Sequence, residues 1–170
     1  MYRTMLVLLV AALLIGCGPR KLTVEDIAKE RKSVEAVLAN FWRALEAEDA
    51  AKMAQLFSPS GIVFFGTDSA EVIKSTAQWE AQLKVDSQLF ESLKVGEPRN
   101  LSTQIDSYGE LASTICEVPV EMTIGGEASR LQARFALTMK NEKGEWHIVQ
   151  GMIALATVGQ SSAELVARMK

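Results

Sequence analysis

The clearest pattern in the sequence is a stripe of apolar residues at helical spacing between residues 34 and 45. Its six members recur at intervals of three and four residues, with polar residues on the opposite side. They are Val34, Val37, Leu38, Phe41, Trp42 and Leu45. We expect a long helix that packs on a core. It begins near Thr23, where a hydroxyl cap precedes Glu25 and Asp26 in the first turn.

Two shorter helices and a strand are predicted next. Asp49 is suited to cap a short helix, which the Pro and Gly of residues 58–61 end. The apolar run Ile62–Phe65 favours a buried strand. Asp68 and Glu71 have the spacing of a capping box, so a third helix is expected to follow them, with Trp79 and Leu83 on its buried side.

From residue 89 onward the helical period disappears and strand patterns take over. Four strands are predicted, separated by glycine-containing turns. They cover Leu101–Ser107, Glu110–Ile124, Ser129–Asn141 and Glu145–Thr157. Strands joined in this way form an antiparallel meander. Pro119 interrupts the second strand, which predicts an edge or a bulge there.

The N-terminus has the pattern of an export signal. Arg3 precedes the 11-residue apolar run Met5–Ile15, which is too short to span a bilayer and has the length of a signal-peptide core. Residues 14–17, Leu-Ile-Gly-Cys, resemble a bacterial lipobox, whose cysteine is lipidated and becomes the first residue of the mature chain. Cys17 is therefore the expected lipidation site. The alternative is an ordinary signal peptide with an incidental cysteine.

These patterns divide the chain into four parts. Residues 1–16 are the predicted signal peptide, 17–22 a lipidated tether, 23–158 one α+β domain and 159–170 a C-terminal helix. Several acyl chains hold a protein firmly at a membrane surface. Gly18, rather than an aspartate, follows the cysteine. In lipoproteins of double-membrane bacteria, this arrangement resembles the pattern that sorts the protein to the outer membrane. We therefore expect a protein of the bacterial cell envelope, anchored in the outer membrane and facing the periplasm; a single-membrane bacterium would instead display it outward.

Composition argues against some partners and bonds but does not identify a function. The 170 residues are 48% hydrophobic and 23% charged, which is ordinary for a globular domain. Loss of residues 1–16 removes one basic residue, Arg3, and changes the net charge from −3 to −4. Nucleic acid is therefore not an expected partner. With Cys17 lipidated, Cys116 has no disulfide partner and is expected to be a small buried hydrophobic residue.

The order of these elements resembles the nuclear transport factor 2-like superfamily, in its SnoaL-like branch. The residues that carry the resemblance lie between Val34 and Thr157 and include Phe41, Ala44, Asp49, Leu56, Phe57, Gly66, Thr67, Asp68, Glu71, Arg134, Gly144, Trp146, Ile148 and Val149. It implies an α+β fold, with a cone-shaped, curved antiparallel sheet packed on three N-terminal helices. It also implies an apolar pocket at the open end and, commonly, a homodimer formed through the outer sheet face.

The resemblance directs attention to Arg134 as a ligand-binding residue. Relatives with arginine at this place often turn it into the cavity, where its guanidinium suits a carboxylate or phosphate. The alternative is an exposed arginine or one paired with Glu117. Strand alternation puts Gln150 on the face of Trp146 and Ile148, so Gln150 is a second candidate for ligand binding. Other residues that could line the cleft, or equally pack in the core, are Trp42, Phe64, Trp79, Tyr108 and Trp146.

Evidence for catalysis in the sequence is weak. Many relatives carry histidines and a serine on the last strand, where this chain has Gln150, Met152 and Ala154. The single histidine, His147, falls on the opposite face. In the related family, Asp68 and Glu71 occupy the turn beside the pocket, but helix capping explains their spacing completely and is the preferred interpretation. Asp68 and Glu117 are the candidate acid-base groups. No metal-ligand spacing and no cofactor motif is evident.

Three functions follow as hypotheses. The first is a membrane-anchored lipoprotein that binds a small, partly apolar molecule, either neutral or anionic, without turning it over. The second is an isomerase, cyclase or dehydratase of the SnoaL-like kind. The third is a module for dimerisation or for contact with an envelope protein.

Overall fold

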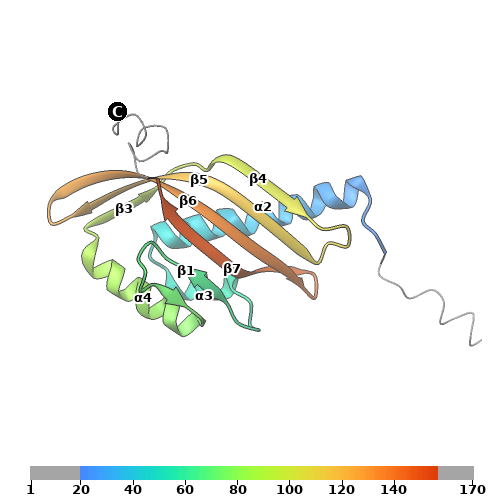
Figure 1. Cartoon of the computed structure of the whole chain (residues 1–170), viewed down its shortest axis with the longest axis horizontal. Helices are drawn as coiled ribbons and strands as arrows, with labels where there is room; N and C mark the ends of the chain where they lie inside the picture. The colour runs from blue at the N-terminus through green and yellow to red at the C-terminus, as the bar shows by residue number, and fades with distance from the viewer. Residues whose placement is uncertain (1–19, 157–170) are drawn as a thin grey trace, which may run out of the picture.

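The computed structural model describes residues 20–156, which form three helices and a curved, unclosed sheet of seven strands, an α+β fold (Figure 1). The helices are α2 (Val24–Glu46), α3 (Ala50–Leu56) and α4 (Thr76–Leu89). Cys17, the predicted signal peptide and the predicted C-terminal helix of residues 159–170 lie outside the described residues.

The seven strands form one mixed sheet. They are β1 (Val63–Phe65), β2 (Val72–Ile73), β3 (Ser92–Val95), β4 (Arg99–Ile105), β5 (Leu111–Ile124), β6 (Glu127–Glu142) and β7 (Glu145–Leu155). Their order is β2-β1-β7-β6-β5-β3, and β4 also pairs with β5. The predicted meander is the antiparallel centre of this sheet, β4 to β7. β1 differs from the expected pattern because it runs parallel to β7.

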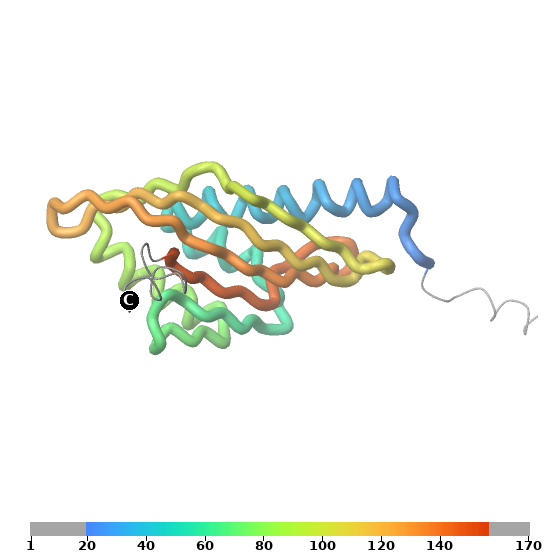
Figure 2. Tube along the Cα trace, turned by 45° about the horizontal axis from the view of Figure 1, so that its top comes forward, coloured from blue at the N-terminus to red at the C-terminus, as the bar shows by residue number. Residues whose placement is uncertain are grey.

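The helices all lie on one side of the curved sheet. α2 runs along the sheet, and α4 lies at the end where β3 and the β5–β6 turn are found (Figures 1 and 2). The concave side of the sheet, covered by these helices, is therefore the only place in the described chain where a large core can form, and the buried apolar residues gather there.

Two of the three predicted helix starts are confirmed. Thr23 and Asp26 form a reciprocal capping box at the start of α2, and Asp49 accepts a hydrogen bond from the Lys52 N–H at the start of α3. The capping box expected at Asp68 and Glu71 is wrong. β2 follows these residues, and α4 begins later with Ser75 as its N-cap.

The predicted apolar stripe of α2 packs into the core. Val34, Leu38, Phe41 and Trp42 are buried, and aromatic rings continue the core toward the sheet. The Trp42 and Phe135 rings meet edge to face, with centroids 4.5 Å apart. The strand expected at Ile62–Phe65 is present as β1, but it is buried on one face only, since Phe65 is 49% exposed.

A bulge in β7 changes which side chains face the core. Thr138 of β6 pairs with Gln150 and Met139 pairs with Ile148, so Val149 is an extra residue without a partner. One extra residue reverses the alternation of every side chain beyond it. Trp146 and Ile148 consequently face the core, whereas Gln150 and Met152 face outward.

Pro119 occupies the interior of β5 without breaking its pairing with β6. It pairs there with Gln132, and its carbonyl oxygen accepts a hydrogen bond of 2.8 Å from the Gly96 N–H on the other side. Proline has no N–H to donate on this same side, and this is where the partner of β5 changes from β3 to β4. The irregularity predicted at Pro119 therefore lies in the neighbouring strands.

Candidate functional site

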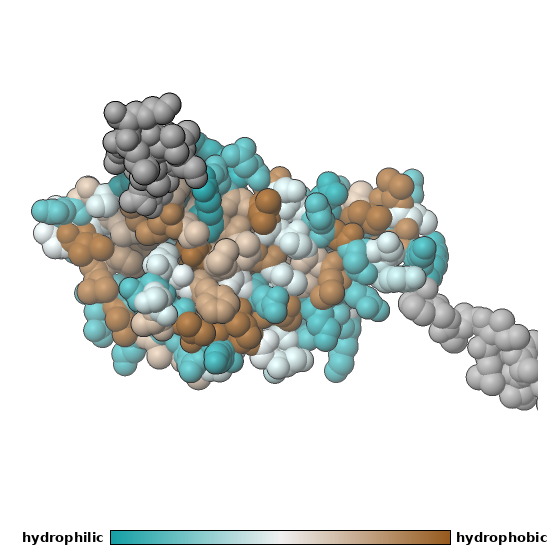
Figure 3. Space-filling model, in the orientation of Figure 1, coloured by the Kyte–Doolittle hydropathy of each residue, from teal (hydrophilic) through white to brown (hydrophobic). Residues whose placement is uncertain are grey.

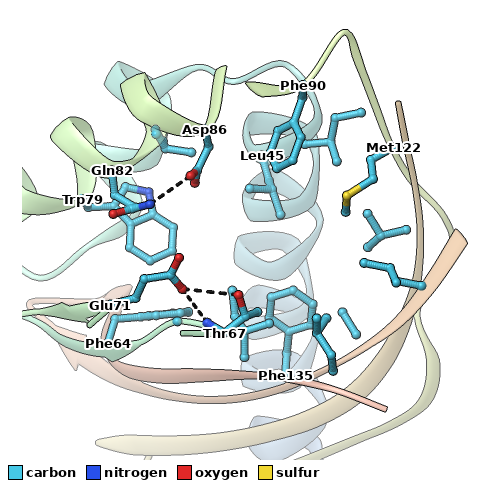
Figure 4. A pocket seen from close by; sticks show the side chains of 18 of the residues that line it. Leu45, Phe64, Thr67, Glu71, Trp79, Gln82, Asp86, Phe90, Met122 and Phe135 are labelled. Atoms are coloured by element: carbon cyan, nitrogen blue, oxygen red, sulfur yellow. Dashed lines mark hydrogen bonds between the residues drawn. The ribbon is translucent and has the colours of Figure 1, made fainter. Parts of the chain in front are cut away.

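The concave side of the sheet encloses a cavity of about 320 Å³ at the end where α4 lies (Figure 4). Most of its walls are apolar. They come from α2, β1, β2, α4, β3, β5, β6 and β7, as Leu45, Phe64, Ile73, Trp79, Leu83, Phe90, Leu93, Val120, Met122, Leu131, Ala133, Phe135, Ile153 and Leu155, with Gly66 beside them. Four polar residues complete the lining: Thr67, Glu71, Gln82 and Asp86.

Phe64 and Trp79 form the aromatic wall of the cavity. Their rings meet edge to face with centroids 4.5 Å apart, and both side chains are buried. Phe64 can take this position because its partner in β7 is Gly151; a Cβ at residue 151 would overlap the Phe64 ring. The indole N–H of Trp79 is buried and has no hydrogen-bond partner among the described residues.

Gln82 and Asp86 enter the cavity from α4. Trp79, Gln82, Leu83 and Asp86 stand at i, i+3, i+4 and i+7, so they share one face of the helix. The Gln82 side-chain amide donates a hydrogen bond of 2.9 Å to Asp86 Oδ1. Burial raises the pKa of the Asp86 carboxyl above its ordinary value; the Gln82 hydrogen bond opposes this rise and the charge of Glu71 adds to it.

Glu71 enters from the loop between β1 and β2. Its Oε2 accepts hydrogen bonds from the backbone N–H groups of Thr67, at 2.6 Å, and Asp68, at 3.0 Å. These two donors fix the direction of the carboxylate. The loop can fold over Glu71 because residue 66 is glycine; a Cβ there would overlap the carboxylate.

The two carboxylates point into the same space (Figure 4). Glu71 Oε1 and Asp86 Oδ2 accept no hydrogen bond from residues 20–156. Lys, Arg and His are absent from the cavity residues of this part of the chain. The cavity therefore combines apolar walls with one negatively charged corner.

The structure places Arg134 outside the cavity, in the second of the two positions expected for it. Its Nε donates a hydrogen bond of 2.9 Å to Glu117 Oε1, and its side chain is 61% exposed. Arg134 and Asn100 together hold the pKa of Glu117 below its ordinary value. Both residues lie on the outer face of the sheet, because cavity-lining Ala133 and Phe135 occupy the other face of β6.

The remaining candidates divide between the cavity, the core and the surface. Phe64 and Trp79 line the cavity as expected. Trp42 and Trp146 lie in the core instead, where the Trp146 indole donates a 2.7 Å hydrogen bond to Glu30 of α2. Tyr108 is 42% exposed in the β4–β5 turn, because Asp106 holds that turn at the surface.

Gln150, Asp68 and His147 are also outside the cavity. The bulge at Val149 turns Gln150 outward, which corrects the prediction based on simple alternation. Asp68 is exposed in its loop, where its carboxylate accepts the Ala70 N–H. His147 is partly buried on the face opposite Trp146, as alternation predicts.

The sequence contained a signal for the residues that were missed. Gln82 and Asp86 continue the face of α4 that Trp79 and Leu83 bury, and a polar residue at a buried helical position indicates a cavity or a partner. For Glu71, the sequence favours a helix cap over a place beside the pocket, and the structure shows that it lines the cavity.

Residues 34–156 match the model of the SnoaL-like domain family, which covers more than half of the chain. The chain belongs to the SnoaL-like domain family. A comparison with curated protein sequences finds no match.

Solved structures support the fold of this SnoaL-like chain. It is similar to hexachlorocyclohexane dehydrochlorinase LinA-type3 from Novosphingobium barchaimii LL02, with a TM-score of 0.69 and 10% identity over 76% of this chain and 88% of that one. A nuclear transport factor 2-like protein with a cystatin-like fold from Novosphingobium aromaticivorans gives 0.65, with 15% identity over 85% and 96%. A Nostoc punctiforme protein of unknown function gives 0.64, with 16% identity over 82% and 97%. At these identities the likeness establishes the fold.

Two further observations concern cofactors and membranes. Within residues 20–156, His, Cys, Asp and Glu side chains form no group of three or more that could hold a metal ion. The three described helices include none with the length and apolar character needed to cross a bilayer.

Proposed function

We propose that the SnoaL-like domain binds a small, largely apolar molecule in the cavity beneath α4. The observation that carries this proposal is the cavity itself: about 320 Å³, walled by apolar side chains, with a few convergent polar groups. Small-molecule sites in proteins are usually built in this way. The buried, unpartnered Trp79 indole and the two carboxylates supply polar contacts that could orient the molecule.

A neutral fluorescent dye, N-phenyl-1-naphthylamine, tests the proposal because its emission rises in apolar surroundings. We expect saturable binding that Ile153→Trp abolishes, since a tryptophan at this lining position fills the cavity. Leu111→Trp is the matched control, because Leu111 is exposed at the far end of β5 and does not line the cavity. Circular dichroism checks that both variants fold. Equal binding by the two folded variants would contradict the proposal.

The second candidate function is proton transfer, in an isomerase, cyclase or dehydratase. Asp86 favours it, because a carboxyl group with a raised pKa in an apolar cavity is suited to general acid-base chemistry. Asp68 and Glu117, the candidates that the sequence suggests, lie outside the cavity. Deuterium exchange at the α-carbon of small apolar ketones in D₂O, followed by NMR, tests it. Exchange that Asp86→Asn abolishes would support catalysis, and exchange at the uncatalysed rate would exclude it for ketones.

Cellular location and assembly are part of the proposal. The apolar run Met5–Ile15 followed by Cys17 supports lipid anchoring to a bacterial envelope membrane, with the domain facing the periplasm.

The outer sheet face supports a homodimer. Phe65, Met152, Ala136 and Ile115 are register partners in a row across β1, β7, β6 and β5, and three of them are 49–55% exposed. Apolar residues interrupt the hydrophilic surface on the side shown in Figure 3.

A further inference from the structure

The charged corner of the cavity restricts the molecule that can bind there. Glu71 and Asp86 are the charged residues of the described lining, and both are acidic. An anionic ligand would face two like charges, with no cation among the described lining residues to offset them. The expectation of an anionic ligand depended on Arg134, which points away from the cavity and is already paired with Glu117.

Each carboxylate keeps one oxygen free for a ligand. The Thr67 and Asp68 N–H groups occupy Glu71 Oε2, and Gln82 occupies Asp86 Oδ1. Glu71 Oε1 and Asp86 Oδ2 accept nothing from the described residues. Acceptors of this kind, held in place by backbone and side-chain donors, are suited to a donor with several N–H groups.

A positive charge would correct an electrostatic imbalance in the cavity. Two like charges that share an apolar space repel each other, and Asp86 is also partly buried. A cationic group between them would offset the repulsion and form charge-assisted hydrogen bonds, which are about twice as strong as neutral ones. The aromatic rings of Phe64 and Trp79 beside them suit the apolar part of the same molecule.

We infer that the ligand is a cationic amphiphile, in which a primary or secondary ammonium group lies between Glu71 and Asp86 and an apolar body fills the rest of the cavity. This inference rests on the proposed function and specifies the chemical class of its ligand. Asp86 and Glu71 are then binding residues, and Gln82 positions Asp86.

Three probes with the same apolar body test the inference: 3-phenylpropylamine, 3-phenylpropanol and 3-phenylpropanoate. Their affinities for the purified full-length chain can be measured at neutral pH by displacement of N-phenyl-1-naphthylamine and by calorimetry. We expect the amine to bind at least about tenfold more tightly than the alcohol, as charge-assisted hydrogen bonds predict, and the carboxylate to bind most weakly.

Two variants locate the preference in the cavity. Asp86→Asn keeps an oxygen that can accept the Gln82 hydrogen bond but removes the charge, so it should lower amine affinity about tenfold and leave alcohol affinity nearly unchanged. Glu80→Gln is the matched control, because Glu80 is an exposed residue of the same helix outside the cavity. It should behave like the original protein.

The outcomes separate this inference from the proposed function. If the alcohol or the carboxylate binds as tightly as the amine, or if Asp86→Asn keeps the amine preference, the cationic ligand is excluded and the cavity remains a binding site. If the dye binds but none of the three probes displaces it, the inference is again overturned. If neither dye nor probes bind, the proposed function fails as well.

Discussion

At the residue scale, Asp86 is the side chain that most distinguishes this cavity from a plain core. A carboxyl group that is partly buried among apolar residues, with its pKa raised, reduces the stability of the folded state once it ionises. Its neighbours on the same helix face, Leu83 and Trp79, are buried residues with large apolar side chains. A polar group retained where an apolar one would pack better indicates function.

Removing this charge should stabilise the protein. Because the pKa of folded Asp86 lies above its unfolded value, the folded state binds more protons between the two values, and stability falls as pH rises through them. Asp86→Asn should therefore raise the melting temperature at neutral pH, and the gain should vanish in acid below the ordinary aspartate pKa. Melting curves from pH 3 to 8, with Glu80→Gln as control, measure this. A variant less stable than the original at neutral pH would contradict it.

At the element scale, the sequence predicted which elements exist better than which way their side chains point. The stripe of α2, the caps at Thr23 and Asp49 and the four long strands follow from local pattern, and the structure has them. The orientation of Gln150 depends on the bulge at Val149, a two-strand property that no single-strand pattern reveals. Short β2 and β3 likewise exist because of their partners in the sheet.

The cavity residues likewise divide into those that local sequence pattern predicts and those that depend on tertiary structure. Phe64 and Trp79 were predictable as large aromatic residues at buried positions. The spacing of Glu71 from Asp68 favours a helix cap, and only tertiary structure shows the loop that turns Glu71 inward. Arg134 and Glu117 are direct partners across β5 and β6, so pairing on the outer face was foreseeable once the register was known.

The start of α4 gives a stability prediction at this scale. The Ser75 hydroxyl accepts the Gln78 N–H and caps the helix that carries Trp79, Gln82 and Asp86. Ser75→Ala should reduce the free energy of unfolding by about 1 kcal/mol, the usual effect of losing such a cap. Ser69→Ala, in the exposed loop before β2, is the control. Equal urea midpoints for the two variants would show that the cap contributes nothing.

At the scale of the whole molecule, the chain combines a predicted lipid anchor with a domain that has its own core. The first residues of α2 lie close in sequence to Cys17, so a lipid there would hold the domain near the membrane surface. The cavity lies toward the β3 end of the sheet, and the exposed apolar row crosses its outer face. Anchor, cavity and outer face are therefore separate features that can be tested separately.

Lipid anchoring predicts a simple fractionation result. The protein should sediment with membranes, and mass spectrometry should find a mature chain that begins at Cys17 and carries acylglyceryl groups. Cys17→Ala should move it to the soluble fraction or leave it unprocessed. A Cys17→Ala protein that is cleaved at the same place and still held tightly by membranes would contradict the lipid anchor.

The outer face predicts a change in assembly. Ile115→Lys places a charge in the apolar row of β5 and should convert a dimer into a monomer in sedimentation experiments. Val85→Lys, at an exposed position of α4 on the helix side of the sheet, is the control. If the original chain is monomeric at high concentration, the proposed dimer is excluded.

The most direct test of the account is a crystal structure of the protein soaked with 3-phenylpropylamine. We predict density in the cavity beneath α4, with the phenyl ring against Phe64 and Trp79. The ammonium nitrogen should lie within hydrogen-bond distance of Glu71 and Asp86. A cavity that stays empty at saturating amine, or a ligand whose ammonium group points away from both carboxylates, would contradict the central claim.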